Sequence, residues 1–561
     1  MTARRKVCVI GSGFGGAVMA CRLAESGRFD VTVLERGPRY GRAGFPRRND
    51  QVRRAFWDPD DGYFGQFEYR SFGRSGVDVL TCAGLGGGSL IYSNVLYRMP
   101  APFFATWPGG LTRTLLDPCY QRALEMLEGQ PYPVDRPAWP YLAATPKAQA
   151  LAEAVARIGA SPRGGPAMRL EWPPLAVQFS AEPGAAVING QGVAQTSCIM
   201  CGECNLGCNT QAKNTLDLNY LTRATQHGAE VRTWCAVSAI DAAGAPDAGW
   251  ILRTGDPRYR ATTSERFDLV VVAAGSLGST ELLLDLAKRR RLSDRVGTQW
   301  SPNGDMLGIL RKTPWPLQPS AGPVITGAIH VDAASYPDGF AGGAWIEDGG
   351  FPAALAWYLG GRLQGWRVGL AGLRGLLRLL QGWFGRRLAE ANVGDDLAPF
   401  LFGAPGFEHT MLMLAMGRDR ATGRFALRDG PGRTDRLHLD WRPGDGELHY
   451  QHARAAMARI GSALGSDFTE NPVDWLGRYI SVHPIGGLPL GDRRETGAID
   501  ATSGEAFGCP DLYVVDGSVI PEAVGPNPSL TIAALAELFA ARLVEREAAR
   551  RPPDPTTEVP S

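Results

Sequence analysis

The segment Lys6-Val-Cys-Val-Ile10-Gly11-Ser12-Gly13-Phe14-Gly15-Gly16 decides the fold of this chain. Its pattern predicts a short apolar strand over 6–10, a glycine-rich turn, and a helix over 17–26. Gly11 permits a tight turn, Gly13 lets the backbone approach a pyrophosphate, and Gly16 brings helix and strand together, so that helix amides point at the phosphates. The segment therefore predicts a dinucleotide-binding unit whose contacts are Gly11, Ser12, Gly13, Phe14, Gly15 and Gly16.

A second strand is expected over 31–35, and it ends in an acidic residue, Glu35. A carboxylate at this place accepts hydrogen bonds from an adenosine ribose and disfavours a ribose 2′-phosphate. A glycine-rich turn that binds nothing is the alternative, and the complete strand, turn, helix and strand disfavour it. The unit alone does not distinguish FAD from NAD.

Composition limits the class of protein. The chain has 561 residues, of which 44% are hydrophobic and 20% charged, with 58 Lys and Arg against 57 Asp and Glu. These values indicate several globular domains or one large two-lobed enzyme, and they exclude wholesale disorder, a collagen-like repeat and a coiled coil. Because the opposite charges balance, we expect no nucleic-acid partner.

The N-terminal apolar run, Val7 to Ile10, is too short for a signal-peptide core or a membrane span, so we expect a cytoplasmic protein. The ten cysteines do not form the regular framework of a small secreted domain. Residues 546–561 end in a stretch rich in Pro, Thr and Glu, and we expect them to form a disordered tail.

Three later segments bear on the cofactor. The cluster Gly84-Leu-Gly-Gly-Gly-Ser-Leu-Ile-Tyr-Ser-Asn94 could approach a cofactor closely, because only glycine leaves such clearance. Residues 511–521 predict a strand that ends in a turn at Asp516 and Gly517. Residues 525–532 (Gly-Pro-Asn-Pro-Ser-Leu-Thr-Ile) predict a loop that leads into a helix.

Together with the N-terminal unit, these segments resemble the glucose-methanol-choline (GMC) oxidoreductase family, and within it the bacterial cholesterol oxidase-like branch. The resemblance spans nearly the whole chain. It also includes Cys198–Cys208, Ala212–Asp217, Asn219–Leu221, Phe267–Ser279, Ser301-Pro-Asn-Gly-Asp305 and His483-Pro-Ile-Gly-Gly487.

The resemblance implies an α/β fold (α+β overall) with FAD bound in a Rossmann-like domain built from discontinuous segments. The expected FAD domain comprises 1–100, 195–305 and 480–545. An inserted substrate domain with a β-sheet and helices would comprise 101–194 and 306–479. Besides the N-terminal turn and Glu35, the implied cofactor contacts are Gly86, Gly87, Ser89, Asn94, Gly275, Asp516, Gly517, Asn527 and Pro528.

The resemblance also implies a catalytic pair. Alcohol oxidation needs a group that receives the hydroxyl proton while hydride leaves for flavin N5, and histidine suits that task at neutral pH. Of seven histidines, His483 matches the family's catalytic residue, and Asn527 matches its active-site amide, which could bond the substrate oxygen or the flavin edge. A structural histidine is the alternative. Pro526 departs from the family pattern and predicts a more rigid loop before Asn527.

We therefore expect an FAD-dependent oxidoreductase that acts on a hydrophobic secondary alcohol, a 3β-hydroxysteroid such as cholesterol, with oxygen or an electron-acceptor partner. The first alternative is a dehydrogenase of a non-steroid alcohol, and the remote one is a non-catalytic membrane-surface binding protein. Some relatives have a carboxylate that moves the steroid double bond. Glu347 and Glu408 lie in the expected substrate domain, but we expect both to be solvated surface groups.

Four cysteines, Cys198, Cys201, Cys204 and Cys208, follow the spacing C-x2-C-x2-C-x3-C of an iron-sulfur ligand run. Such a cluster could relay electrons to a partner. Asn209 stands where ferredoxins have proline, and zinc, a disulfide and four unligated thiols remain alternatives.

Residues 355–388 combine Leu and Trp with six arginines and no acidic residue. Arg367, Arg374 and Arg378 would share one face of a helix lying in a membrane interface, whereas six arginines prevent the segment from spanning the bilayer. We expect a peripheral membrane contact here. The alternative is an amphipathic helix packed on the substrate domain, and the many glycines weaken any continuous helix.

Overall fold

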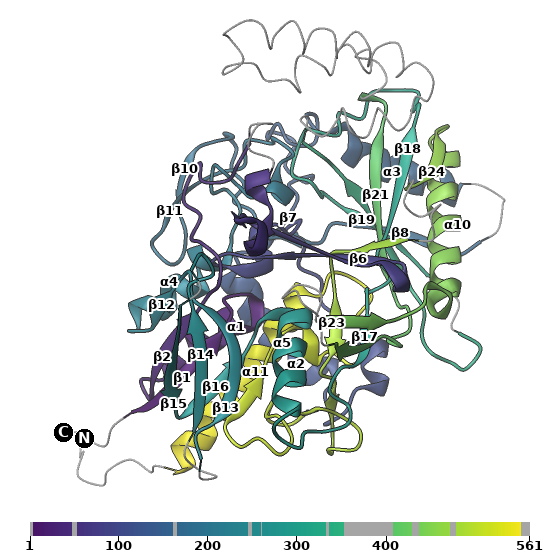
Figure 1. The fold of residues 1–561 in the computed structure, drawn as a ribbon. Helices are drawn as coiled ribbons and strands as arrows, with labels where there is room; N and C mark the ends of the chain where they lie inside the picture. The colour runs from purple at the N-terminus through teal and green to yellow at the C-terminus, as the bar shows by residue number, and fades with distance from the viewer. Residues whose placement is uncertain are drawn as a thin grey trace, which may run out of the picture.

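The computed structural model describes residues 4–47, 53–160, 165–244, 249–259, 261–332, 336–352, 408–428, 437–471 and 478–550. Its centre is a parallel five-stranded sheet in the order β12-β2-β1-β16-β29. The strands are β1 (Arg5–Ile10), β2 (Phe29–Leu34), β12 (Glu230–Arg232), β16 (Leu269–Val272) and β29 (Leu512–Val514). Distant parts of the chain therefore build one sheet, as the resemblance implied (Figure 1).

Helices cover the central sheet. They are α1 (Phe14–Glu25), α4 (Tyr220–Gln226), α5 (Gly275–Ala287) and α11 (Ser529–Arg550). All four residues of β16 are buried, as expected for a parallel strand covered on both faces. Helix α1 starts three residues before the expected position, because Gly13 is its N-cap and the last glycines of the turn already belong to the helix.

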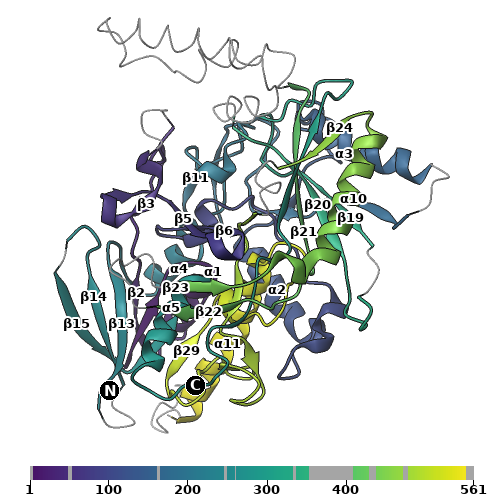
Figure 2. The same cartoon turned by 45° about the vertical axis from the view of Figure 1, so that its right-hand side comes forward.

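A second, six-stranded sheet forms the other half of the molecule, in the order β24-β18-β21-β20-β19-β8. Its strands are β8 (Met168–Glu171), β18 (Met306–Arg311), β19 (Ala328–Val331), β20 (Ala344–Gly349), β21 (Met411–Gly417) and β24 (Asp467–Glu470). Helices α3 (Pro146–Gly159) and α10 (Glu447–Ala463) pack on one face of it (Figure 2). The opposite face is turned toward the loop that includes Asn527, because Gly525 packs against Trp345 of β20.

Smaller sheets and a further helix accompany the two main sheets. A three-stranded sheet comprises β5 (Phe67–Phe72), β6 (Val77–Cys82) and β25 (Tyr479–Ser481), and another comprises β13 (Ala236–Ala242), β14 (Trp250–Gly255) and β15 (Thr262–Phe267). Helix α2 (Arg113–Met126) packs against α11. The two-stranded pairs are β3 (Trp57–Asp58) with β4 (Tyr63–Phe64), β7 (Gln130–Pro131) with β9 (Pro174–Leu175), β10 (Ala186–Ile188) with β11 (Ala194–Thr196), β17 (Thr298–Ser301) with β26 (Ile485–Gly487), β22 (Arg424–Leu427) with β23 (Leu437–Asp440), and β27 (Leu490–Gly491) with β28 (Ile499–Asp500).

The C-terminal helix extends further along the chain than the sequence predicted. The expected tail was wrong at its start, because 546–550 form the last turn of α11, where Glu547 is buried and pairs with Arg5 at 3.3 Å. Residues 551–561 and the expected membrane contact at 355–388 lie outside the described residues. Within the part of the chain that the structure describes, every helix is too short or too polar to cross a bilayer.

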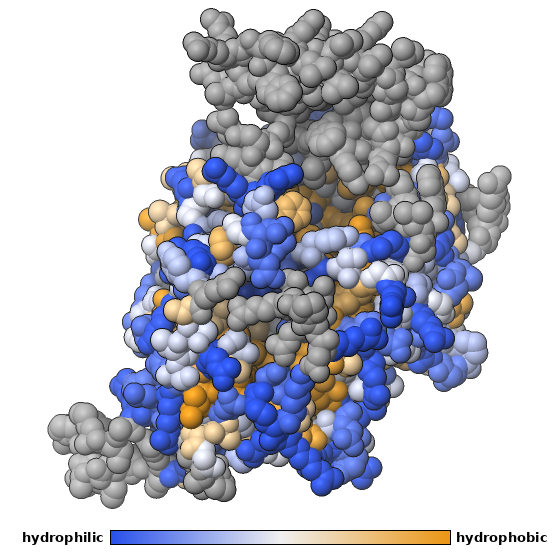
Figure 3. All heavy atoms as spheres, viewed as in Figure 1, coloured by the Kyte–Doolittle hydropathy of each residue, from blue (hydrophilic) through white to orange (hydrophobic). Residues whose placement is uncertain are grey.

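On the face shown in Figure 3, hydrophilic residues cover most of the described surface, and hydrophobic ones show mainly in recesses between them. The division into two domains at the expected boundaries stays a prediction.

Candidate functional site

The N-terminal turn packs its backbone against the ends of two neighbouring strands. Gly11 has φ +97°, and a Cβ there would lie 2.3 Å from the Ala273 carbonyl oxygen. A Cβ at Gly15 would lie 1.6 Å from the Val515 carbonyl oxygen. These distances exclude any side chain at either position, so the turn sits directly on the segments that follow β16 and β29.

Glu35 joins three segments at the end of β2. Its Oε2 accepts the Ser12 backbone N–H (3.2 Å) and hydroxyl (2.6 Å), and its Oε1 accepts the backbone N–H groups of Gly37 (2.8 Å) and Gly84 (3.3 Å). The carboxylate is buried and already has four protein donors. Its contact with an adenosine ribose stays a prediction.

The glycine-rich loop 84–94 lies against this turn. A Cβ at Gly87 would lie 2.6 Å from the Gly13 Cα, and the Gly86 backbone N–H donates to the Ser12 hydroxyl oxygen at 3.0 Å. Ser89 is fully buried, and its Oγ donates to the Gly86 carbonyl and accepts the Leu216 N–H. The structure therefore brings together the two glycine clusters that the sequence indicated.

Asp516 forms hydrogen bonds with the segments around Gly275 and Ser518, which follow β16 and β29. Its Oδ2 accepts the Gly275 N–H at 2.8 Å and the Ser279 hydroxyl at 2.5 Å, and its Oδ1 accepts the Ser518 N–H at 2.8 Å. Gly517 follows it in a short 3-10 turn, and Pro528 lies at the start of α11, where its carbonyl accepts the Ile532 N–H. Burial raises the pKa of Asp516.

These segments fit a large polar cofactor. A Cβ added at Gly13, Gly88 or Gly275 would meet no atom within 4 Å, so three glycine backbones face open space beside otherwise tight packing. Among the described residues, neither side-chain amide atom of the buried Asn94 has a hydrogen-bond partner, and neither does Asn527 Oδ1. Buried amide atoms are costly without a partner, so their position indicates a ligand with donors and acceptors there.

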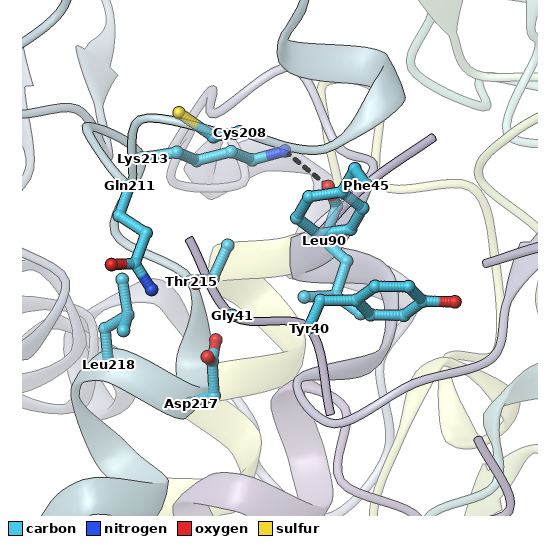
Figure 4. Close-up of a pocket in the computed structure, with 10 residues that line it drawn as sticks. All are labelled: Tyr40, Gly41, Phe45, Leu90, Cys208, Gln211, Lys213, Thr215, Asp217 and Leu218. Carbon is cyan, nitrogen blue, oxygen red and sulfur yellow. Dashed lines mark hydrogen bonds between the residues drawn. The ribbon is translucent and has the colours of Figure 1, made fainter. Parts of the chain in front are cut away.

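A small pocket borders this region (Figure 4). Lys213 points toward Leu90 and donates to the carbonyl oxygens of Leu90 (3.1 Å), Tyr92 (2.7 Å) and Cys204 (3.0 Å), and burial lowers its pKa to about 8. Asp217 lies on the opposite side of the pocket, where burial raises its pKa to about 6. Lys213 thereby ties the cysteine-rich loop to the glycine-rich loop.

The iron-sulfur prediction finds no support. Cys198 is buried, Cys201 is exposed, and Cys204 and Cys208 are half-buried, so the four thiols do not share one environment. Cys198 Sγ instead accepts the Met200 N–H, and Cys208 Sγ contacts the Thr210 hydroxyl. Over the described ranges, no group of three or more His, Cys, Asp or Glu residues is arranged to hold a metal ion. The structure has the four residues as free thiols.

His483 lies between β25 and β26, and an aspartate contacts it. Asp305 Oδ1 lies 2.8 Å from His483 Nδ1, and Asp305 Oδ2 accepts the backbone N–H groups of Val482 (2.7 Å) and His483 (2.9 Å). Asp305 is 5% exposed. Asp305 was part of a motif in the sequence, yet nothing there assigned it to His483.

Asn527 is buried at the entrance to α11 and faces β20 of the six-stranded sheet. The loop before it packs on the same strand, because a Cβ at Gly525 would lie 2.7 Å from the rings of Phe103 and Trp345. Asn527 hydrogen-bonds to the Glu347 carboxyl group.

The expectation that Glu347 is a solvated surface group was wrong. Glu347 is 1% exposed on β20, and burial raises its pKa well above the usual range, with the charge of Asp348 adding to the rise. The hydrogen bond with Asn527 acts in the opposite direction. Burial therefore favours the protonated, neutral form of Glu347, beside the predicted catalytic amide. Glu408, by contrast, is exposed as expected.

The sheet face that includes Glu347 is largely apolar. Strand register places Leu414 directly opposite both Glu347 and Leu307, and Leu412 opposite Gly349. Leu307, Leu412 and Leu414 are half-buried, whereas Met411 and Met413, on the other face, are fully buried in the core. Partial exposure of leucines on an inward face indicates an apolar surface available to a ligand.

A polar group borders this face at its β8 edge. Glu171 and Glu347 lie on either side of Ala328 in neighbouring strands, and the Tyr97 hydroxyl donates to Glu171 Oε2 at 2.9 Å. His330 stacks on Trp345, with ring centroids 4.5 Å apart. The face thus combines apolar area with polar groups at one end, which a strand-by-strand pattern in the sequence did not indicate.

Family comparisons agree with the resemblance inferred from the sequence. Two GMC oxidoreductase models match the chain, one at residues 180–290 and the other at residues 420–536, and the model of the NAD(P)-binding Rossmann-like domain matches residues 9–61. The match to the Rossmann-like domain contains the N-terminal turn.

The chain is similar over its full length to curated proteins. It is 31% identical to a cholesterol oxidase of Mycobacterium tuberculosis (strain ATCC 25618 / H37Rv), with 98% of this chain and 92% of the relative covered. It is 27% identical to a cholesterol oxidase of Acinetobacter baumannii, with 94% and 92% covered. Among solved structures, pyridoxine 4-oxidase from Mesorbium loti superposes with a TM-score of 0.59 at 16% identity, covering 96% of this chain and 99% of that one.

Proposed function

Because the chain belongs to the GMC oxidoreductase family and is an FAD-dependent alcohol oxidoreductase, we propose that its substrate is a 3β-hydroxysteroid such as cholesterol. The observation that carries this proposal is the apolar face of the six-stranded sheet next to the loop of Asn527. Leu307, Leu412 and Leu414 supply a surface for a rigid hydrocarbon, and the polar groups that would bind a hydroxyl lie beside it. Relatives named cholesterol oxidases, similar over nearly the full chain, support the same substrate.

The roles of the two predicted catalytic residues follow from their chemistry. FAD, when bound, supplies the acceptor of the hydride that leaves the carbinol carbon. His483 receives the hydroxyl proton, since its Nε2 is the ring nitrogen that Asp305 does not contact. The Asn527 amide donates a hydrogen bond to the substrate oxygen, a contact that strengthens as negative charge develops there.

Cofactor contacts divide between the two glycine clusters and the Asp516 turn. Gly13 and Gly88 leave the clearance that the dinucleotide requires, and Asn94 presents unpaired amide atoms. Asp516 orders the backbone of Gly275 and Ser518 on the opposite side.

Glu347 suggests a second step on the same substrate. A ring double-bond shift requires a carboxylate that takes a proton from one ring carbon and returns it to another. The deprotonated form of Glu347 would take that proton, and its raised pKa favours holding it between the two steps. We therefore assign double-bond isomerisation of the oxidised steroid to Glu347.

Molecular oxygen is the proposed electron acceptor. The relatives over nearly the full chain are named oxidases, which supports oxygen as the acceptor. A dehydrogenase of a non-steroid alcohol is the competing function.

An anaerobic titration of the flavin absorbance with a 3β-hydroxysteroid tests the substrate. We expect the oxidised flavin band to bleach, and to return rapidly when air is admitted. The matched control is the 3α-hydroxy epimer, which has the same hydrophobicity and should bleach the flavin far more slowly. Failure of the 3β-hydroxysteroid to bleach a protein that dithionite reduces normally would reject the sterol assignment, and slow reoxidation in air would reject oxygen as the acceptor.

The His483→Ala variant tests the catalytic assignment. We expect bound flavin with reduction by about 100-fold or more slower, the range that a general base contributes. Reduction at the wild-type rate would remove His483 from the mechanism.

A further inference from the structure

A five-residue turn, Ser301-Pro-Asn-Gly-Asp305, connects β17 to β18 behind the predicted catalytic pair. Ser301 and Asn303 are fully buried, and Asp305 is 5% exposed. Strand β17 pairs with β26, which follows His483, and β18 belongs to the sheet that includes Glu347. The turn therefore lies where the two halves of the molecule meet, and neither the sequence motif nor the family match gives it a role.

Asp305 makes four contacts to the stretch 481–483, one of them with the Ser481 hydroxyl, which donates to Oδ2 at 3.4 Å. One carboxylate oxygen contacts the His483 ring nitrogen Nδ1, and the other accepts the backbone N–H groups of Val482 and His483. The ring and the backbone that supports it are thus held by one side chain. Since a carboxylate only accepts hydrogen bonds, this contact requires a proton on Nδ1, and in the neutral ring Nε2 then keeps the lone pair that a general base needs.

Asn303 makes three contacts to the loop that leads to Asn527. Its Nδ2 donates to the carbonyl oxygens of Pro526 (3.1 Å) and Gly525 (3.4 Å), and its Oδ1 accepts the Val524 N–H (3.0 Å). An amide side chain is needed because the contacts include both donors and an acceptor. These contacts fix the backbone immediately before Asn527.

Hydrogen bonds with other segments also hold the turn 301–305. Ser301 Oγ accepts the Asn303 N–H (2.8 Å) and donates to Asp419 Oδ1 (2.6 Å). His449 Nε2 donates to the Gly304 carbonyl at 2.8 Å, and burial lowers the His449 pKa to about 4, so the ring is neutral at pH 7. The Asn303 carbonyl accepts the Gly417 N–H at 3.2 Å. These hydrogen bonds therefore fix the backbone from which the side chains of Asn303 and Asp305 extend.

We propose that the turn 301–305 aligns the catalytic pair, with Asp305 as the positioning residue of His483 and Asn303 as the positioning residue of Asn527. The proposal rests on the assignment of His483 and Asn527 as the pair that acts on the alcohol. It adds that one short turn sets the protonation site of the base and the place of the amide at the same time. A change in either side chain then alters one partner and leaves the other in position.

Asp305→Asn is the decisive variant, because its outcome follows from the contacts. The single oxygen of the new amide must accept the two backbone N–H groups, since both remain buried. The NH2 group then faces His483 Nδ1 and donates to it, which moves the ring proton to Nε2. A ring protonated at Nε2 cannot accept the hydroxyl proton.

Nitrogen NMR of the FAD-loaded protein with 15N-labelled histidine, the His483 signals assigned by their loss in His483→Ala, reads the tautomer directly. We expect a proton on Nδ1 in the wild type and on Nε2 in Asp305→Asn. A wild-type ring protonated on Nε2 would overturn the proposal. This readout does not depend on the substrate, so it stands even if the sterol assignment fails.

Flavin reduction under anaerobic conditions gives the kinetic test, with a 3β-hydroxysteroid or with whichever alcohol bleaches the wild type. Asp305→Asn should slow reduction about 100-fold or more, while flavin content and the affinity for the ketone product stay unchanged. Asp305→Glu, which keeps the acceptor, should recover part of the rate. Asp241→Asn, the same change at an exposed ion pair, is the matched control. Equal rates in Asp305→Asn and the control would refute the proposal.

Asn303→Asp tests the other half. The carboxylate loses both donors to Gly525 and Pro526 but keeps the size of the side chain. We expect slower flavin reduction, while the His483 ring keeps the wild-type proton on Nδ1. Asp305→Asn, by contrast, should move that proton to Nε2. Should this variant fold poorly, Asn303→Ser removes the same contacts without adding charge. Wild-type rates in a folded variant would exclude Asn303 as a positioning residue.

Discussion

Glu347→Gln should make the protein more stable at neutral pH, and the gain should depend on pH. Burial raises the pKa of Glu347 well above its usual range. In the unfolded chain a glutamate titrates near pH 4.3, so between that pH and the folded pKa only the folded state holds the proton. Its contribution to stability is therefore complete below about pH 4.3 and is lost as pH rises through the folded pKa. Glutamine has no such loss.

The magnitude follows from the linkage. Each pH unit in this window costs the wild type about 1.4 kcal/mol, which amounts to at most about 4 kcal/mol at pH 7. The unfolding entropy of 561 residues is about 1.2 kcal/mol per degree, at about 2 cal/mol/K per residue. We therefore expect a gain in Tm of up to about 3 °C at pH 7 that shrinks toward zero near pH 4.5.

Thermal unfolding of the FAD-loaded variant and wild type, compared at several values between pH 4.5 and 8, measures this difference. Glu125→Gln, at an exposed position of α2, is the matched control and should show no pH-dependent gain. A Tm difference that is constant with pH, or a Glu347→Gln protein that is less stable at pH 7, would refute the claim that burial raises the pKa of Glu347.

Two further predictions concern the cofactor region and the sheet. Gly13→Ala should leave a folded apoprotein with reduced FAD content, because the new methyl group enters the open space beside the turn. Gly15→Ala should not fold, since its Cβ would lie 1.6 Å from the Val515 carbonyl oxygen. The ratio of flavin to protein absorbance and the melting curve distinguish the two outcomes. Lys147→Met should cost about 3 to 5 kcal/mol by leaving Asp348 buried without its partner at 2.7 Å, as measured by denaturant unfolding; a loss under about 1 kcal/mol would contradict the structure.

Local patterns predicted much of the FAD-binding half. The strand, turn and helix around Gly11 lie close together in sequence, so periodicity and glycine spacing were sufficient to predict β1, α1 and β2. The helix start was misplaced because the pattern does not distinguish glycines of the turn from glycines in the first helical turn. Glu35 was expected as the last residue of a strand over 31–35; it directly follows β2, which spans Phe29–Leu34, and its hydrogen bonds to Ser12 and Gly84 depend on packing across the chain.

Residues of the substrate half were harder to predict, because their environment comes from distant strands. Glu347 follows Trp345 by two positions in an alternating stretch, but only the pairing of β20 with β19 and β21 buries it. Asp305 lies 178 residues from His483, and the contact depends on the pairing of β17 with β26. The cysteine spacing matched that of iron-sulfur ligands, but the fold places the four thiols in different environments, from buried to exposed.

The order of strands in the central sheet has a consequence for biosynthesis. Strand β29 and helix α11 come from the end of the chain, yet β29 pairs with β16 and α11 packs on α1, which is made almost first. A nascent chain that has not passed Leu512 lacks an edge of the sheet and the turn at Asp516. Long-range pairing of this kind is slow to form and leaves hydrophobic faces uncovered in the meantime. The complete cofactor region, which includes the turn at Asp516, therefore forms only once the last segments have been synthesised.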